Sequence, residues 1–142
     1  MNSTSLEAVV SIELNATPER VFQALTTGEI TKWWVRPGIF DTRSFSGDAR
    51  TGGTWKASGT ARGNAYELEG SYLEVDGPKK LVHTWHLVGS PLTTTVSYEL
   101  VPTPAGTRLT LTHGTFPSEE IYDANRIGWD TSFEALRDLL GA

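Results

Sequence analysis

The chain has 142 residues, enough for one domain whose core needs no disulfide or metal to hold it. It carries 12 basic and 17 acidic residues, a net charge of -5, and the basic residues are scattered, which excludes a nucleic-acid-binding footprint. Cysteine is absent, which excludes disulfides, thiolate chemistry and cysteine zinc sites, and no stretch is apolar enough to span a membrane. We expect a single domain over residues 1–142, cytoplasmic and without a secretory signal in Met1–Glu7.

The first part of the chain predicts one strand followed by two short helices. Apolar and polar residues alternate from Leu6 to Leu14, which is typical of a half-buried strand. Thr17-Pro18-Glu19 then supplies an N-cap, a proline at the first helical position and an early acid, and Gly28 is placed to end that helix. A second helical piece is expected over Glu29–Trp34, closed by Pro37-Gly38.

The middle of the chain predicts an antiparallel meander. From residue 40 onward the apolar pattern has period two, and glycine or proline turns interrupt it. The expected strands cover residues 40–48, 54–61, 66–75, 81–88, 93–101 and 107–114. The Gly63-Asn64 pair suits a tight hairpin, and the apolar parity slips across Gly70-Ser71, which predicts a β-bulge that bends the strand.

The end of the chain predicts one long helix over Ser118–Leu140. Its spacing of three and four places one stripe toward the sheet, formed by Asn125, Trp129, Ser132, Phe133, Leu136 and Leu140. Since a meander of six strands twists and curls, its concave face can receive this helix. The fold class expected from these elements is therefore α+β.

These residues resemble the START-like or SRPBCC superfamily, which has the helix-grip fold, and within it the homologues of the activator of the heat-shock-protein-90 ATPase. The segments that carry the resemblance are 16–22 before Trp33-Trp34, 52–55, 70 with 73–82 and Trp85, 107–113, and Gly128-Trp129. The resemblance implies a curved antiparallel sheet of six to seven strands wrapped on the C-terminal helix, with two short helices after the first strand. It also implies a cavity between sheet and helix, which the superfamily uses for lipids, sterols, polyketides and other apolar molecules.

The residues expected to meet a ligand are bulky or polar side chains on the predicted inner faces and at the rim. They are Trp33, Phe40, Trp55, Tyr72, Trp85, His113, Phe116, Asn125, Gly128, Trp129 and Phe133. Gly128 either leaves room for a ligand or allows close approach of the helix to the sheet. Trp55 alternates with small residues on a face that is either concave or outer.

His113 is the candidate for catalysis, because it shares parity with Leu109 and Leu111 and is expected to face inward. The alternative is a hydrogen-bonded core histidine. His83 and His86 are three residues apart in a predicted strand and point to opposite faces, so no metal site is expected. No phosphate-binding loop, dinucleotide fingerprint or nucleophile elbow is present, so no cofactor is expected either.

Three functions follow as hypotheses. The favoured one is a binding protein for a small apolar or aromatic molecule, without an enzymatic activity. The second is a cyclase, lyase or hydrolase of polyketide-like or aromatic substrates that uses His113. The third is a stress-related regulator of a heat-shock-protein-90-type chaperone ATPase, which would give the protein a chaperone partner. An exposed strand edge and the number of tryptophans also allow a homodimer.

Overall fold

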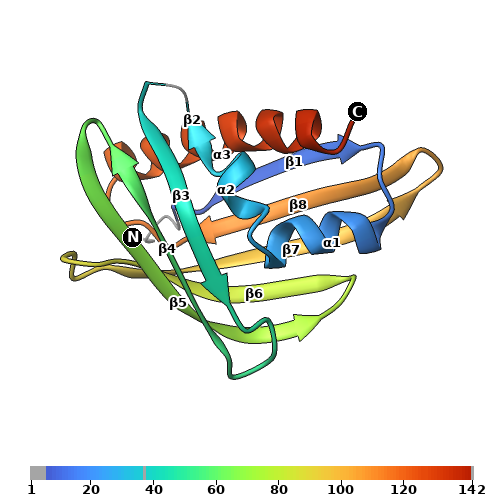
Figure 1. Ribbon diagram of the computed structural model, residues 1–142, viewed down its shortest axis with the longest axis horizontal. Helices are drawn as coiled ribbons and strands as arrows, with labels where there is room; N and C mark the ends of the chain where they lie inside the picture. Colours follow the sequence, from blue (N-terminus) through green and yellow to red (C-terminus); the bar gives the residue numbers. More distant parts are fainter. Residues whose placement is uncertain (1–5, 37, 142) are drawn as a thin grey trace, which may run out of the picture.

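A computed structural model describes residues 6–36 and 38–141 of the chain, in the predicted order of elements (Figure 1). The N-terminal part contains β1 (Ala8–Leu14), α1 (Pro18–Thr26), α2 (Ile30–Trp33) and β2 (Val35–Arg36). The meander contains β3 (Phe40–Gly47), β4 (Thr54–Ala61), β5 (Asn64–Asp76), β6 (Lys80–Leu87), β7 (Thr93–Thr103) and β8 (Gly106–Gly114). The chain ends in α3 (Glu119–Leu139). The predicted α+β helix-grip fold is confirmed.

The sheet has eight strands in the order β1-β8-β7-β6-β5-β4-β3-β2, and every neighbouring pair is antiparallel. The strand added to the expected six or seven is β2, only two residues long, which follows α2 directly. Figure 1 shows β3 and β4 crossing the view steeply while β6, β7, β8 and β1 run nearly horizontally, so the sheet turns strongly along its width. Helix α3 contacts both edge strands, β1 and β2.

The irregular positions of the sheet differ slightly from those predicted. The β5–β6 pairing shifts between Tyr72 and Glu74, not at Gly70-Ser71, so Leu73 is the extra residue of the bulge. The β4–β5 hairpin turns at Arg62 and Gly63, one residue earlier than expected. Both turn residues have positive φ, 51° and 83°, as a two-residue type I′ loop requires.

Gly70 has a packing role in place of the predicted bulge. A methyl group there would stand 2.1 Å from the backbone oxygen of Thr84 and 2.3 Å from Nε1 of Trp55. No larger residue fits between these atoms without moving them. The glycine therefore lets the Trp55 indole lie against β5 and donate a hydrogen bond of 3.3 Å to the Thr84 carbonyl.

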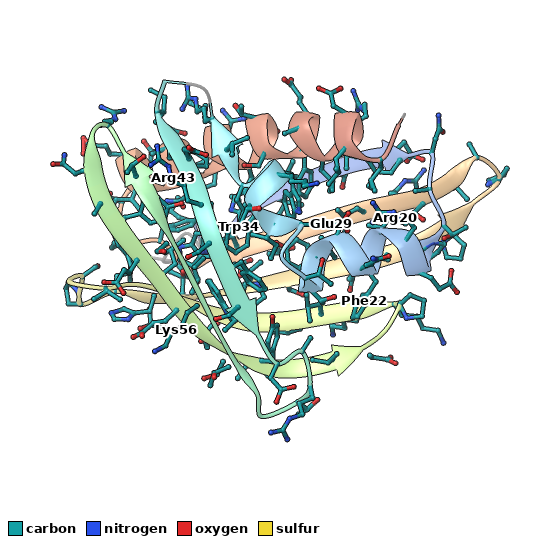
Figure 2. The ribbon with its side chains drawn as sticks, in the orientation of Figure 1. Arg20, Phe22, Glu29, Trp34, Arg43 and Lys56 are labelled. Carbon is teal, nitrogen blue, oxygen red and sulfur yellow. The ribbon has the colours of Figure 1, made fainter. Side chains whose placement is uncertain are left out.

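The helix starts are capped as predicted, and the two short helices are tied together. Thr17 Oγ1 accepts from the backbone N–H of Arg20 at 3.2 Å, and Ser118 caps α3 in the same way. Figure 2 shows Arg20 and Glu29 side by side along α1. Arg20 lies in the first turn of α1 and Glu29 directly precedes α2, and the guanidinium donates two hydrogen bonds of 2.8 Å to the carboxylate. This pair fixes the segment that carries Trp33 and Trp34.

Candidate ligand-binding site

Five tryptophans occur in the chain, and all five meet in one aromatic cluster under the helices. Trp34 lies at its centre. Its ring centroid is 5.1 Å from that of Trp85, 5.6 Å from Trp55 and 6.1 Å from Trp129. Trp33 approaches Trp34 edge-on, with the ring centroids 6.0 Å apart. The edge-to-face and tilted geometries are those that aromatic rings prefer, so the rings of the cluster stabilise one another.

A pocket of about 490 Å³ lies beside this cluster, between the concave sheet and the N-terminal half of α3. The sheet contributes Thr42, Ala61, Tyr66, Leu68, Trp85 and Thr94. Helix α3 contributes Ile121, Ala124, Asn125, Gly128, Trp129 and Ser132. The segment after α2, strand ends and connections contribute Trp34, Phe40, Leu87, Ser90, Leu92 and Phe116.

The wall of the pocket is uncharged. None of the eighteen described residues that line it is an acid, a lysine, an arginine or a histidine. Two of them, Leu87 and Ile121, are 43% and 37% exposed, so apolar side chains also reach the solvent at its border. Apolar surface left open beside a concave site is typical of a place where an apolar molecule enters.

Gly128 lies on the helix side of the pocket, where it is not needed for close packing. A methyl group added to it would meet only Phe40, at 3.8 Å, which is ordinary van der Waals contact. Of the two roles considered for this glycine, room in the pocket therefore fits the geometry better than close approach to the sheet. A glycine in a helix interior costs about 1 kcal/mol relative to alanine, and here that cost falls on a residue of the pocket wall.

His113 faces inward and is fully buried, but it lies behind the pocket wall. Both of its ring nitrogens are hydrogen bonded to residues of that wall. The indole N–H of Trp129 donates to Nδ1 at 3.0 Å, and Nε2 lies 2.7 Å from Oγ1 of Thr94. Burial, with a smaller contribution from the charge of nearby His83, lowers the pKa of His113 to about 3. The ring is therefore neutral at physiological pH.

Two hydroxyl groups, on β3 and β5, form a second polar pair at the pocket wall. The hydroxyls of Thr42 and Tyr66 are hydrogen bonded to each other, and both residues line the pocket. Burial raises the pKa of Tyr66, while its hydrogen bond with Thr42 acts in the other direction. The phenol therefore stays protonated and neutral.

The two other histidines take opposite faces of β6, as their spacing predicts. His83 is buried, its Nδ1–H donates to the backbone oxygen of Thr84 at 2.9 Å, and burial lowers its pKa to about 4. His86 lies near the surface between the Ser90 carbonyl, at 2.8 Å, and the Glu69 carboxylate, at 3.1 Å, and these acceptors raise its pKa. In residues 6–36 and 38–141, no group of three or more histidines and acids is arranged to hold a metal ion.

The structure brings six of the eleven predicted contact residues to the pocket. They are Phe40, Trp85, Phe116, Asn125, Gly128 and Trp129. The other five are buried core residues outside its wall, namely Trp33, Trp55, Tyr72, His113 and Phe133.

Packing contacts account for the positions of three of these side chains, Trp33, Trp55 and Phe133. Trp33 turns back onto α1, where its indole N–H donates to the Ala24 carbonyl at 2.8 Å. Trp55 packs on Gly70, and its strand face is the concave one, because Trp55 and Ala57 are both buried. Phe133 lies one turn beyond Trp129 on α3 and packs on Trp33, with ring centroids 6.2 Å apart.

Several wall residues did not appear in the prediction. Thr94 has the same parity on β7 as Val96 and Tyr98, so its inward direction was available from the alternation. Ser132 belongs to the predicted inner stripe of α3 and is buried there. Trp34 is not among the eleven predicted contact residues, although the sequence places it near the rim of the sheet, where it could form part of a cavity mouth. It follows the last residue of α2 and its backbone has left the helix, with ψ of 64°.

Comparisons with known proteins agree with this fold. A family model described as "Activator of Hsp90 ATPase homolog 1-like protein" matches residues 15–141. A solved structure from Chromobacterium violaceum is 25% identical with a TM-score of 0.87, over 96% of this chain and 97% of that one. One from Mesorhizobium loti is 27% identical with a TM-score of 0.77, over 94% and 96%. The AHSA1 protein from Silicibacter pomeroyi, at 22% identity and a TM-score of 0.78 over 94% and 96%, supports the fold alone. No curated protein matches the chain.

Proposed function

The chain belongs to the family of activator of Hsp90 ATPase homolog 1-like proteins, and from that premise we propose that it binds a small, uncharged, largely apolar molecule in the pocket under α3. The observation that supports this is a pocket of about 490 Å³ whose lining contains no charged side chain. Its volume falls in the range of sites that enclose drug-sized ligands, and such sites are mainly apolar with a few placed polar groups.

Binding is better supported than catalysis by His113. A general base needs a ring nitrogen within reach of the substrate and a pKa near the working pH. Both nitrogens of His113 are hydrogen bonded to Thr94 and Trp129, and burial lowers its pKa to about 3. The imidazole is therefore suited to orient its neighbours rather than to take a proton from a substrate.

The chaperone hypothesis rests on the family description alone. A pull-down with a heat-shock-protein-90-type chaperone and a measurement of that chaperone's ATPase rate test it independently of the pocket. No retention of the chaperone and no change in its ATPase rate would remove this alternative.

Ligand binding is tested by unfolding experiments with a panel of uncharged polycyclic compounds and their carboxylate analogues. A compound that occupies the folded protein at 100 times its Kd adds about 2.7 kcal/mol to the free energy of unfolding. We expect uncharged members to raise Tm in a saturable manner and the carboxylates to have no effect.

A blocked variant and a matched control locate the binding. Gly128→Leu places a branched side chain in the pocket wall and is expected to abolish the Tm shift. Glu134→Leu introduces the same side chain at an exposed position of α3 and is expected to respond as the wild type does. If no uncharged compound stabilises the protein, or if Gly128→Leu binds as well as the wild type, the proposed function is wrong.

A further inference from the structure

We propose that the pocket selects an uncharged ligand that carries a hydrogen-bond acceptor, such as a ketone or ester carbonyl, and that the hydroxyl of Thr94 donates to it. This inference rests on the proposed function, because it specifies the class of molecule that the same pocket takes. It follows from the directions of three hydrogen bonds that link Trp129, His113, Thr94 and the Trp85 backbone oxygen.

The direction of the first hydrogen bond is fixed by the indole. The ring nitrogen of a tryptophan is a donor only, so the contact of 3.0 Å between Trp129 Nε1 and His113 Nδ1 requires Nδ1 to be the acceptor. A neutral imidazole carries one proton, which must then be on Nε2. Trp129 therefore sets the tautomer of His113.

The direction of the second hydrogen bond, between His113 and Thr94 at the pocket wall, follows from this tautomer. With its proton on Nε2, His113 donates to Oγ1 of Thr94 across 2.7 Å. The threonine oxygen thus serves as an acceptor, and its own proton has to find another partner. A hydroxyl that already accepts a hydrogen bond is a stronger donor, because hydrogen bonds in a chain polarise one another.

Within the protein, the hydroxyl proton of Thr94 has a weak acceptor. The acceptor in its reach is the Trp85 backbone oxygen at 3.5 Å, the outer limit of a hydrogen bond. Thr94 is only 5% exposed, and it lines the pocket. A buried, polarised donor with a weak partner is best satisfied by an acceptor atom on the molecule that occupies the pocket.

The same surroundings exclude an anionic acceptor. The pocket wall offers no lysine or arginine, and His113 is neutral and already hydrogen bonded at both nitrogens. A carboxylate or phosphate buried there would lose its hydration without gaining an opposite charge. An uncharged carbonyl accepts the Thr94 proton at no such cost.

The selection is tested with three compounds of one shape, namely 2-acetylfluorene, 2-ethylfluorene and fluorene-2-carboxylate, by isothermal titration calorimetry. We expect wild-type protein to bind the ketone about fivefold more tightly than the hydrocarbon, the size of one neutral hydrogen bond, and not to bind the carboxylate measurably. Thr94→Val is expected to bring the ratio of ketone to hydrocarbon affinity to about one. Thr94→Ser, which keeps the hydroxyl, is expected to retain the preference.

Trp129 and His113 act here as positioning residues, and ring ¹⁵N spectra of His113 report their effect directly. Wild-type protein is expected to show Nε2 protonated and Nδ1 unprotonated. Trp129→Phe removes the donor to Nδ1, so the proton can move to Nδ1 and the Thr94 hydroxyl can donate to Nε2 instead. The ketone preference is then expected to shrink even though the threonine is unchanged. Because only the ratio of two affinities within one variant is compared, a general weakening of binding does not affect the result.

Failure of the inference and failure of the proposed function give different results. If neither the ketone nor the hydrocarbon binds, the proposed function fails and this inference falls with it. Equal binding of the two compounds to wild-type protein, or a ketone preference that survives Thr94→Val, overturns the inference alone. A proton on Nδ1 of His113 in wild-type protein also overturns it.

Discussion

Acidification is expected to destabilise the protein at a mildly acidic pH, because two histidines are buried in the neutral form. In an unfolded chain the pKa of a histidine is about 6.5. Burial lowers the pKa of His83 to about 4 and that of His113 to about 3 in the folded protein. Below pH 6.5 the unfolded chain therefore binds protons that the folded chain does not, and stability falls as the pH falls.

The size of the effect follows from the same values. Between pH 7.5 and pH 5.5 an unfolded histidine takes up most of one proton, while the folded pKa of both residues lies well below this window. Linkage converts this difference into a loss of roughly 1 to 2 kcal/mol per histidine, or about 3 kcal/mol for the pair. Since small domains are stable by only about 5 to 15 kcal/mol, the loss is easily measured.

The assay is urea unfolding followed by tryptophan fluorescence at a series of pH values in the His86→Gln background. That substitution removes the histidine whose raised pKa acts in the opposite direction. The window stops at pH 5.5 because carboxylates begin to titrate below it. A change of less than 1 kcal/mol over the window would refute the reasoning, as would NMR titration of His83 or His113 in the native protein between pH 5.5 and 7.5.

Three further predictions concern single substitutions. Gly128→Ala should stabilise the protein by about 0.5 to 1 kcal/mol in urea unfolding, because its methyl group meets only Phe40 at 3.8 Å; a loss of stability would show that the glycine is needed for packing. Gly70→Ala should destabilise it by about 2 kcal/mol or more, because its methyl group would stand 2.1 Å from the Thr84 oxygen, and unchanged stability would contradict that close approach. His86→Gln should reduce stability below about pH 6.5, where the protonated ring can donate to both of its acceptors, and the difference from wild type should vanish as the pH rises through the raised pKa. Unfolding curves at pH 6 and pH 9 check this, and an equal difference at both would speak against it.

The inner face of the sheet could be predicted from the sequence because strand periodicity leaves little freedom. Alternation placed Leu109, Leu111 and His113 on one side of β8, and the structure buries all three. The same rule applied to β7 places Thr94 on the inner face of the sheet, where it contributes a hydroxyl group to the pocket wall. Helix caps at Thr17 and Ser118 were equally local and equally predictable.

The division between pocket wall and solid core could not be predicted, because it depends on contacts between distant segments. Trp33 and Trp34 are neighbours in the sequence, yet one hydrogen bonds to α1 and the other lines the pocket. Trp129 and Phe133 lie on one helical stripe, and only the first reaches the open space. Periodicity states that such side chains face inward, but not which of them finds a neighbour to fill the volume in front of it.

The contact of α3 with both β1 and β2 also bears on the solubility of the protein. These are the two outermost strands of the sheet, and strand edges are the places where one chain can pair with another and aggregate. A helix that packs against both edges restrains both, so partial detachment of α3 would loosen the two edges in a single event. If the pocket binds a ligand as proposed, that ligand opposes the detachment of α3, and its loss is expected to promote precipitation as well as lower the thermal stability.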